Sequence, residues 1–600
     1  MQSESRICQN CEQSFVIDPD DFAFYEKIQV PSPTWCPECR TIRRFTFRNE
    51  RTIYRRTCDL CKKAMVSVYH PSSPFTVYCY ECFYGDKWDQ LSSGRDYDFS
   101  KSFFEQYREL ALRAPKLGLQ VSNDLVNTEY GNHIGGDKNC YLVFASVNNE
   151  DCMYCTYVSY SRNVVDGLRI FKSEACFDSV DCENCSNIKY SQQCQNSLDS
   201  SFLYNCRGCS NCFMCSNLVG KSYCARNKQY SKEEYQKIIG AATLGSRASV
   251  SALIGEFIKL KQYSLQRSIE GFNHVNSSGN NLRNTKNCKV CFDLSEGEDS
   301  GYVVYGNDVK DTMDAYAVYP KTELCYETVG SGAPSYNAKF SYLPWAGSDL
   351  TYCINAFSGC HDCFGCNHVH NVRYCVMNKQ YSKEEYEALV PKIIEHMKTM
   401  PYSDKKGRIY SYGEFFPPEL SPFAYNETIV QEHFPLSKEE TIAGGYAWRD
   451  PDTKSYQITK KPEDLPDDIQ SVDDSILNET IGCAHKGECH HQCATAFKVI
   501  KDELTFYRRM DIPLPQLCQN CRHYERLAMR NPLKLWHRTC ACSGKESGIR
   551  NQNSGNEHVY QNTTTHFHGE KPCPNEFETS YAPDRPEIVY CEQCYQAEVV

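Results

Sequence analysis

The sequence has no apolar segment long enough to cross a bilayer, and its first residues, Met-Gln-Ser-Glu-Ser-Arg, contain no apolar run of the kind found in secretion signals. It also has no excess of basic residues. The formal net charge of −11 argues against a surface that binds nucleic acid everywhere, although local basic patches remain compatible with it. We therefore expect a cytoplasmic protein without a membrane partner. In a reducing cytosol, clustered cysteines more often bind metal than form disulfides.

The patterns of common active sites are absent as well. The sequence contains no nucleophile–base constellation, no phosphate-binding loop and no dinucleotide-binding fingerprint. We therefore expect no enzymatic activity and no catalytic residues. What the chain has in abundance is cysteine, with 38 residues among 600, and it is long enough to form several domains.

The two ends of the chain are copies of one cysteine-rich module. The series Cys8-x2-Cys11, 24 residues, Cys36-x2-Cys39, 18 residues, Cys58 recurs at a constant offset of 482 as Cys493, Cys518, Cys521 and Cys540. Each module then ends in Val-Tyr-Cys-x2-Cys. Paired C-x2-C motifs supply the four thiolates of a tetrahedral zinc site that has no open position for water. The sequence therefore predicts two structural zinc sites in each module.

The predicted zinc ligands of the first module are Cys8, Cys11, Cys36 and Cys39 for one site, and Cys58, Cys61, Cys79 and Cys82 for the other. Those of the second module are Cys489, Cys493, Cys518, Cys521, Cys540, Cys542, Cys591 and Cys594.

The second module departs from the repeat in two places. His490 stands at the position that matches Cys8, and either His490 or the adjacent Cys489 can supply the ligand; we favour Cys489. Ser543 matches Cys61, with Cys542 one residue earlier. An insertion also adds residues that either form a further metal site or are spare side chains: His566, His568 and Cys573.

These ends resemble a treble-clef or zinc-ribbon domain found in uncharacterised bacterial proteins. The resemblance lies in Cys8-Gln-Asn-Cys11, the aromatic pair Phe24-Tyr25 and the segment Trp35-Cys-Pro-Glu-Cys-Arg40. The chain is also similar to cysteine-rich proteins of uncultivated bacteria whose ends read like Tyr581-Ala-Pro-Asp-Arg-Pro-Glu-Ile-Val-Tyr-Cys-Glu-Gln-Cys-Tyr-Gln. The resemblance covers roughly the outer third of the chain and implies zinc binding, but no particular activity.

The middle of the chain contains a second duplication with a period of three. Asn227–Tyr235 recurs unchanged at Asn378–Tyr386, an offset of 151. All twelve cysteines from Cys140 to Cys224 fall on one frame of three, and the other positions of that frame are mostly small or apolar. A helix would drift from this frame at 3.6 residues per turn, and a flat strand has period two. We therefore expect a narrow parallel β-solenoid whose frame residues point inward.

The second copy is degenerate. Cys325 and Cys353 leave the frame, and a Gly/Pro/Tyr-rich insertion at about 328–346 is expected to interrupt the repeat. A solenoid needs covered ends. Helices are predicted near 99–114, 231–268 and 382–399, the last two starting with the capping-box pattern Ser-x-x-Glu.

The fold class expected from these patterns is multi-domain and mainly β with capping helices: terminal treble-clef or zinc-ribbon modules that flank a duplicated cysteine-rich β-solenoid. The predicted divisions are a double zinc module at 1–95, a helical linker at 96–122, solenoid repeats with C-terminal helices at 123–270 and 271–400, a connector at 401–482 that is acidic at its end, and a second double zinc module at 483–600.

One run of cysteines admits a different metal. Cys206-x2-Cys209-x2-Cys212-x2-Cys215 approaches the iron–sulfur pattern C-x2-C-x2-C-x3-C-P, but its last gap is shorter and Ser216 replaces the proline. The frame of three already explains these cysteines as one inward row. A metal-free row of thiols is the favoured interpretation; an iron–sulfur cluster and additional zinc are the alternatives.

Each module also carries a basic run with interleaved aromatic residues, among them Phe45, Phe47 and Tyr54. Such runs are typical of single-stranded RNA or DNA binding, in which cations contact phosphates and rings stack on bases. The alternative is that the arginines support the negatively charged zinc sites. The candidate nucleic-acid-binding residues are Arg40, Arg43, Arg44, Arg48, Arg51, Arg55, Arg522, Arg526, Arg530 and Lys534.

The leading hypothesis is therefore a non-enzymatic, zinc-stabilised scaffold that binds RNA or DNA through its terminal modules. A protein–protein interaction scaffold without nucleic acid is the first alternative. The second is a metal-dependent redox carrier that uses the solenoid cysteines.

Overall fold

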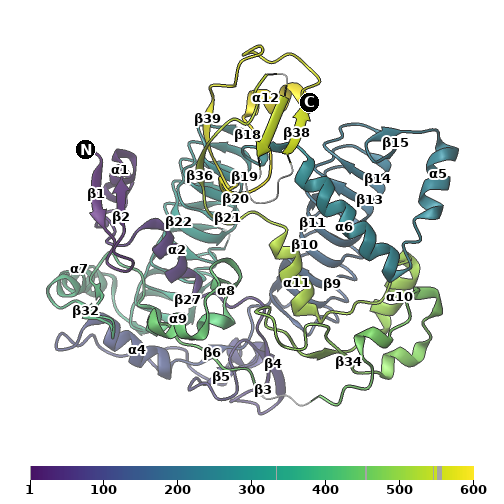
Figure 1. The fold of residues 1–600 in the computed structure, drawn as a ribbon. Coiled ribbons are helices and arrows are strands. Elements are labelled where there is room, and N and C mark those ends of the chain that lie inside the picture. The colour runs from purple at the N-terminus through teal and green to yellow at the C-terminus, as the bar shows by residue number, and fades with distance from the viewer. Residues whose placement is uncertain (1, 333, 453–455, 545, 551–556, 600) are drawn as a thin grey trace. The chain divides into compact units, whose positions relative to one another are not determined.

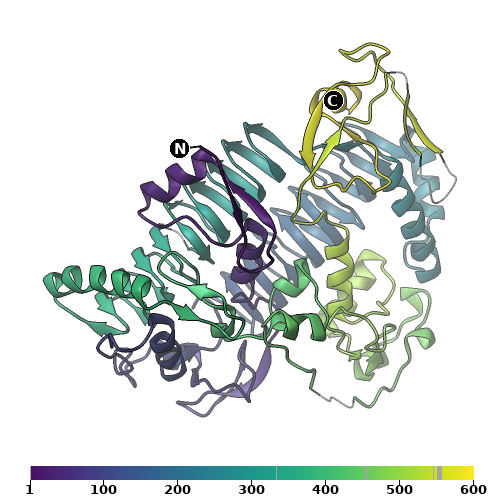
Figure 2. The ribbon, with the colours of Figure 1, turned by 60° about the vertical axis from the view of Figure 1, so that its left-hand side comes forward.

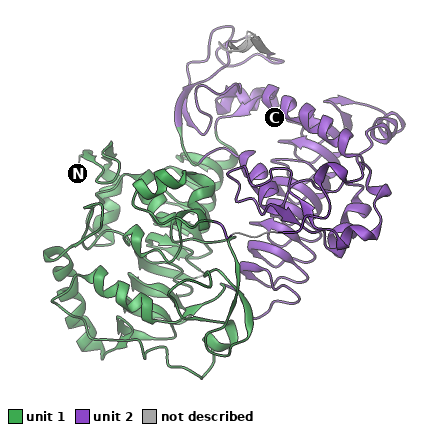
Figure 3. Cartoon of the chain, turned by 60° about the horizontal axis from the view of Figure 1, so that its bottom comes forward, with its two compact units in different colours: residues 1–119, 269–450, 533–535 green, residues 120–268, 451–532, 536–600 purple. Residues whose placement is uncertain are grey.

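The computed structural model describes residues 2–332, 334–452, 456–544, 546–550 and 557–599. The chain divides into two compact units (Figure 3). Unit 1 comprises Met1–Leu119, Ile269–Asp450 and Leu533–Leu535, and unit 2 comprises Gln120–Ser268, Pro451–Pro532 and Trp536–Val600. The expected mainly-β, multi-domain architecture is confirmed, with cysteine clusters near both ends of the chain.

Unit 2 is built on a ten-stranded sheet whose strands follow one another in chain order (Figure 1). All neighbours are parallel except the last pair, and paired residues lie twelve apart, as in Val165↔Phe177 and Cys212↔Cys224. The strands are β7 (Gly131–Gly135), β8 (Tyr141–Val147), β9 (Met153–Thr156), β10 (Val165–Phe171), β11 (Glu174–Glu183), β12 (Ser186–Lys189), β13 (Leu198–Tyr204), β14 (Ser210–Ser216), β15 (Ser222–Ala225) and β16 (Lys228–Gln229).

The period of three has a backbone cause. From Asn139 to Arg226, every third residue has a left-handed φ between about +43° and +62°. Asn, Asp and Gly tolerate this conformation best, which explains why they recur at the third position of the triplets. From Cys140 to Cys215, every residue that follows a left-handed one is buried. All twelve cysteines from Cys140 to Cys224 are buried in one cluster, while Asn184 and Asn196 are exposed, so the predicted inward frame is confirmed.

Unit 1 is built on a twelve-stranded sheet, again parallel except for its last pair, with β27 and β29 paired beside it (Figure 2). The strands are β18 (Gly271–Val275), β19 (Gly279–Lys286), β20 (Cys291–Glu298), β21 (Val304–Lys310), β22 (Met313–Val318), β23 (Thr322–Glu323), β24 (Tyr326–Val329), β25 (Ser335–Lys339), β26 (Ser348–Thr351), β27 (Ile354–Phe357), β28 (His361–Phe364), β29 (Asn367–His370), β30 (Arg373–Val376) and β31 (Lys379–Gln380).

The expected interruption at residues 328–346 shifts the frame of three by one residue, but it does not break the sheet. The described part of that segment supplies β25, which pairs with β24 and β26. In all, the frame is shifted by one residue at three pairings that are thirteen apart: Met313↔Tyr326, Tyr326↔Lys339 and Ser348↔His361. The three shifts add up to one triplet. Cys325 and Cys353 are therefore buried like the others, and Cys360 returns to the original frame.

Short paired strands complete both units. In unit 1 they are β1 (Glu4–Ile7) with β2 (Ser14–Ile17), β3 (Tyr54–Thr57) with β4 (Ala64–Ser67), β5 (Val77–Tyr78) with β6 (Lys116–Leu117), and β32 (Tyr402–Ser403) with β33 (Ile409–Tyr410). In unit 2 they are β17 (Gln266–Arg267) with β40 (Val589–Tyr590), β34 (Ile481–Gly482) with β35 (Ala496–Phe497), β36 (Trp536–Thr539) with β39 (Glu576–Thr579), and β37 (Glu546–Arg550) with β38 (Glu557–Gln561).

The helices of unit 1 are α1 (Pro19–Lys27), α2 (Pro37–Phe45), α3 (Tyr80–Phe83), α4 (Phe103–Arg113), α7 (Lys383–Thr399), α8 (Val430–His433) and α9 (Lys438–Ala443). Those of unit 2 are α5 (Lys232–Ala241), α6 (Arg247–Tyr263), α10 (Lys501–Met510), α11 (Gln519–Ala528) and α12 (Glu592–Val599). The helix expected at 231–268 is two helices. Both predicted capping boxes form, Ser231 with Glu234 and Ser382 with Glu385. The helices they start, α5 and α7, pack on β15 and β30, next to the last strand of each sheet.

The segment 401–482 is more than the expected connector. Glu463, Asp464 and Asp473 are exposed, as a solvated acidic stretch requires. However, Leu465, Ile469, Val472 and Ile476 between and beside them are buried in the core of unit 2. Alternation of buried and exposed side chains packs this segment onto the unit.

Candidate metal centres and the arginine helices

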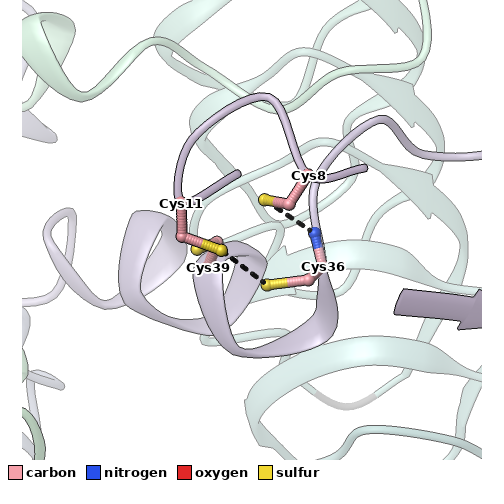
Figure 4. A group of neighbouring side chains, drawn as sticks. All are labelled: Cys8, Cys11, Cys36 and Cys39. Carbon is pink, nitrogen blue, oxygen red and sulfur yellow. Dashed lines mark hydrogen bonds between the residues drawn. The ribbon is translucent and has the colours of Figure 1, made fainter. Parts of the chain in front are cut away.

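The first cysteine cluster is formed by the β1–β2 hairpin and the start of α2 (Figure 4). Cys8 and Cys11 lie in the hairpin turn, Cys36 caps α2, and Cys39 lies in its first turn. The four Sγ atoms lie within 4.8 Å of one another, and Cys11 Sγ is 3.8 Å from Cys36 Sγ. Zn–S bonds of about 2.3 Å in a tetrahedron give sulfur–sulfur edges of about 3.8 Å, whereas a disulfide requires about 2 Å. The predicted set therefore fits zinc.

The second cluster repeats this geometry with Cys58, Cys61, Cys79 and Cys82, between the β3–β4 hairpin and α3. Cys61 Sγ is 3.8 Å from Cys79 Sγ. In both clusters the backbone N–H of the cysteine that caps the helix donates to the sulfur of the first cysteine: Cys36 to Cys8 at 3.2 Å and Cys79 to Cys58 at 3.3 Å. Such bonds, together with the positive end of the helix dipole, stabilise thiolates.

One cysteine in each N-terminal cluster has a lowered pKa. For Cys8, hydrogen bonds from the Cys36 and Cys39 side chains lower the pKa well below that of a free thiol. For Cys58, burial raises the pKa but backbone hydrogen bonds from Cys79 and Cys61 outweigh it, and the pKa falls to about 7. Because the thiolate is the form that binds metal, these groups are poised as ligands.

The third cluster contains a cysteine that the sequence analysis did not assign, while the predicted ligand Cys489 lies in a neighbouring group of possible metal ligands. It consists of Cys483, Cys493, Cys518 and Cys521, so Cys483 takes the place that we assigned to Cys489. Cys518 N donates to Cys483 Sγ at 3.3 Å, as Cys36 does to Cys8, and the Sγ–Sγ distances from Cys521 are 3.8 Å to Cys483 and 3.6 Å to Cys518. The offset of 482 missed Cys483 because nine residues, not two, separate it from Cys493.

The fourth cluster corrects one predicted ligand. Cys540, Cys573, Cys591 and Cys594 come together, so Cys573 takes the place that we assigned to Cys542. Cys573 Sγ is 3.8 Å from Cys591 Sγ, and Cys591 N donates to Cys540 Sγ at 3.2 Å. In this module 32 residues separate Cys540 from Cys573, whereas only two separate the corresponding Cys58 and Cys61. The longer segment contains Cys542. Insertions inside the knuckles explain both errors, because they break the local spacing without breaking the site.

The predicted nucleic-acid-binding arginines of α2 and the turn after it lie in the interior of unit 1. Arg40, Arg43, Arg44 and Arg48 are at most 1% exposed. Arg43 forms ion pairs of 2.7 Å with both Glu327 and Glu414, and Arg40 and Arg44 pair with Asp314 at 2.9 and 3.1 Å. Phe45 and Phe47 are fully buried. These side chains cannot contact phosphates or bases in this conformation; they attach α2 to β22 and β24.

The matching helix of unit 2 does the same. Arg522 and Arg526 pair with the buried Asp166, at 3.4 and 3.0 Å, and Arg530 pairs with Asp181 at 3.0 Å. These ion pairs attach α11 and the turn after it to β10 and β11. Of the remaining candidates, Arg51 pairs with Glu432, Lys534 is exposed and pairs with Glu38, and Arg55 is exposed. Six of the candidates therefore bind carboxylates of the central sheets: Arg40, Arg43, Arg44, Arg522, Arg526 and Arg530.

The cysteines of the parallel sheets form buried rows, and most of their thiols have a raised pKa. In unit 2, thiols donate to backbone carbonyls of their own and the next turn, as Cys194 does to Gln192 and Leu203. Burial raises the pKa of Cys176 and Cys194 well above that of a free thiol, and that of Cys215 to about 11. By contrast, hydrogen bonds from the Cys206 and Cys212 side chains lower the pKa of Cys209 to about 3. The metal-free interpretation of the row is therefore supported by the burial of the thiols and by their hydrogen bonds to backbone carbonyls.

Within the part of the chain that the structure describes, no helix combines the length and apolarity needed to cross a membrane. A scan against protein-family models gives no match for this chain, and a search of curated proteins gives none either.

Proposed function

We propose that this protein is a non-enzymatic scaffold in which zinc-bound modules are fastened onto two β-solenoids, and that it serves as a protein-interaction platform. The observation that carries the proposal is the double use of α2 and α11. Each helix begins at a cysteine of a four-cysteine cluster and presents arginines to buried carboxylates of the adjacent sheet. Metal binding and docking of the module are thereby coupled through one helix.

The metal assignment rests on ligand chemistry. Four thiolates with sulfur–sulfur distances near 3.8 Å suit tetrahedral Zn²⁺, and no open coordination position remains to activate water. Zinc would act as a structural element, since each module has a small core of its own. The hairpin followed by a helix with two ligands at its start supports the treble-clef or zinc-ribbon assignment for both ends.

The solenoid assignment rests on the parallel order and register of the strands. Successive turns of twelve residues place like residues in one column, with cysteines inside and polar side chains outside. Outside columns include hydrogen-bonded ladders such as Asn127–Asn139–Asp151. A regular, polar and rigid surface of this kind is suited to recognising another protein rather than to catalysis.

Nucleic-acid binding remains the alternative, but its main support is gone, because the arginines from which we inferred it bind carboxylates. A redox role for the sheet cysteines is disfavoured by their burial, since redox-active cysteines are accessible thiolates.

The test is a titration of the full chain with single-stranded RNA and DNA at low salt, alongside removal of zinc by a chelator. We expect that neither RNA nor DNA binds in a salt-dependent manner. We also expect chelation to expose 1–119 and 451–600 to protease before 120–268. Salt-dependent binding that is lost in Arg55→Glu would restore the nucleic-acid hypothesis.

A further inference from the structure

The insert between Cys483 and Cys493 folds back onto the third cysteine cluster. We propose that it binds a second zinc ion through His485, Cys489, His491 and Cys521, so that the thiolate of Cys521 bridges two ions. One ligand atom from each of these residues lies within 4.8 Å of all the others. This inference rests on the proposed zinc occupancy of the four-cysteine clusters.

The sulfur distances place Cys521 in both tetrahedra. Its Sγ is 3.8 Å from Cys483 and 3.6 Å from Cys518 on the side of the first ion, and 3.7 Å from Cys489 on the side of the second. All three values are close to the edge of about 3.8 Å expected for zinc thiolates. A thiolate sulfur has enough lone pairs to bind two zinc ions. Two thiolates and two imidazoles are a ligand set that zinc accepts readily.

The two histidines give an independent indication. The Nδ1 atoms of His485 and His491 are buried, and within the described residues neither has a hydrogen-bond partner. A buried, unpaired ring nitrogen is costly, and a metal ion would satisfy it. The rings are also held in place: they pack edge to face at 5.3 Å, and His491 stacks on Tyr524. These ring contacts fix the orientation of both imidazoles.

The fourth cluster shows the same pattern. Its insert places Cys542 Sγ 3.1 Å from His566 Nδ1, and His568 Nε2 is 3.3 Å from Cys594 Sγ. Cys594 is the last ligand of its cluster, as Cys521 is of the third. The N-terminal clusters have only two residues between their first two cysteines, Cys8-x2-Cys11 and Cys58-x2-Cys61, and so have no such insert. Inserts with histidine and cysteine are therefore the feature that distinguishes the C-terminal module.

The experiment compares zinc content per full-length chain in the wild type, the double variant His485→Ala/His491→Ala, and the control His490→Ala. The double variant keeps every cysteine, and His490 is an exposed neighbour outside the proposed site. We expect the double variant to lose one zinc ion per chain and the control to lose none. Unchanged zinc in the double variant overturns the inference. A wild type without zinc would refute the zinc assignment of the scaffold itself.

A second measurement needs no variant. After replacement of zinc by the NMR-active cadmium isotope, two ions that share the Cys521 sulfur should show a mutual scalar coupling. That coupling should disappear in Cys489→Ala if the variant folds. A wild-type spectrum without any coupled pair overturns the bridged site, even if the variants fail to fold.

Discussion

Replacing Arg43 with methionine tests whether buried arginines fasten the first module to its sheet. The Arg43 guanidinium is fully buried and makes charge-assisted bonds of 2.7 Å to Glu327 and Glu414, whose side chains are 0% and 5% exposed. Methionine preserves most of the packing but leaves two buried carboxylates facing a neutral side chain. Removing one member of a buried ion pair costs about 3–5 kcal/mol. We expect the free energy of unfolding of unit 1 to fall by that amount.

The change is measured by urea denaturation of the full chain, with the slope of the transition compared between variants. The matched control is Arg55→Met, because Arg55 is exposed; it should change stability by no more than about 0.5 kcal/mol. The loss of unfolding free energy in Arg43→Met should become smaller as the pH falls. Burial already raises the pKa of Glu327, and once this carboxyl is protonated it no longer carries an unpaired buried charge. If Arg43→Met is as stable as the control, the arginine does not fasten the module.

Three further outcomes are expected. Cys483→Ser should remove zinc from the third cluster, whereas Cys542→Ser should leave the four-cysteine set of the fourth cluster intact. Zinc content is measured for both variants after treatment with a chelator. A greater loss of zinc in Cys542→Ser than in Cys483→Ser would refute the corrected ligand sets. Alkylation of the native protein should leave Cys182, Cys194 and Cys206 unmodified, and rapid labelling of these thiols would contradict their packing. Cys194→Arg should abolish the folded state of unit 2, as judged by circular dichroism, because an unpaired charge would enter a buried apolar row. Burial lowers the pKa of Lys116 from 10.5 to about 7, so between these pH values the unfolded state binds more protons than the folded state and the stability should rise with pH. The variant Lys116→Met should remove this pH dependence and stabilise the protein near pH 7 by up to about 5 kcal/mol. An unchanged pH dependence in the variant would show that Lys116 is not its source.

The sequence by itself determined the features that depend on local spacing. The C-x2-C pairs of the first module identified both of its clusters, since a knuckle closes within a few residues and needs no information from elsewhere. The frame of three identified the buried cysteines of unit 2, because each triplet places one left-handed residue before one inward residue. In the second copy three single-residue shifts hid the same rule, and only the strand pairing revealed it.

Tertiary structure alone decided the rest. The N-terminal module belongs to the unit built on the second parallel sheet, and most of the C-terminal module belongs to the unit built on the first, an arrangement that no sequence interval indicates. Arg40 meets Asp314 across 274 residues of chain, so a basic run that suggests phosphate binding instead neutralises buried carboxylates. Cys483 and Cys573 likewise reach their clusters past inserts. A metal site or an ion pair is selected by geometry in the folded chain, and its free energy changes only slowly with the number of residues that separate its members.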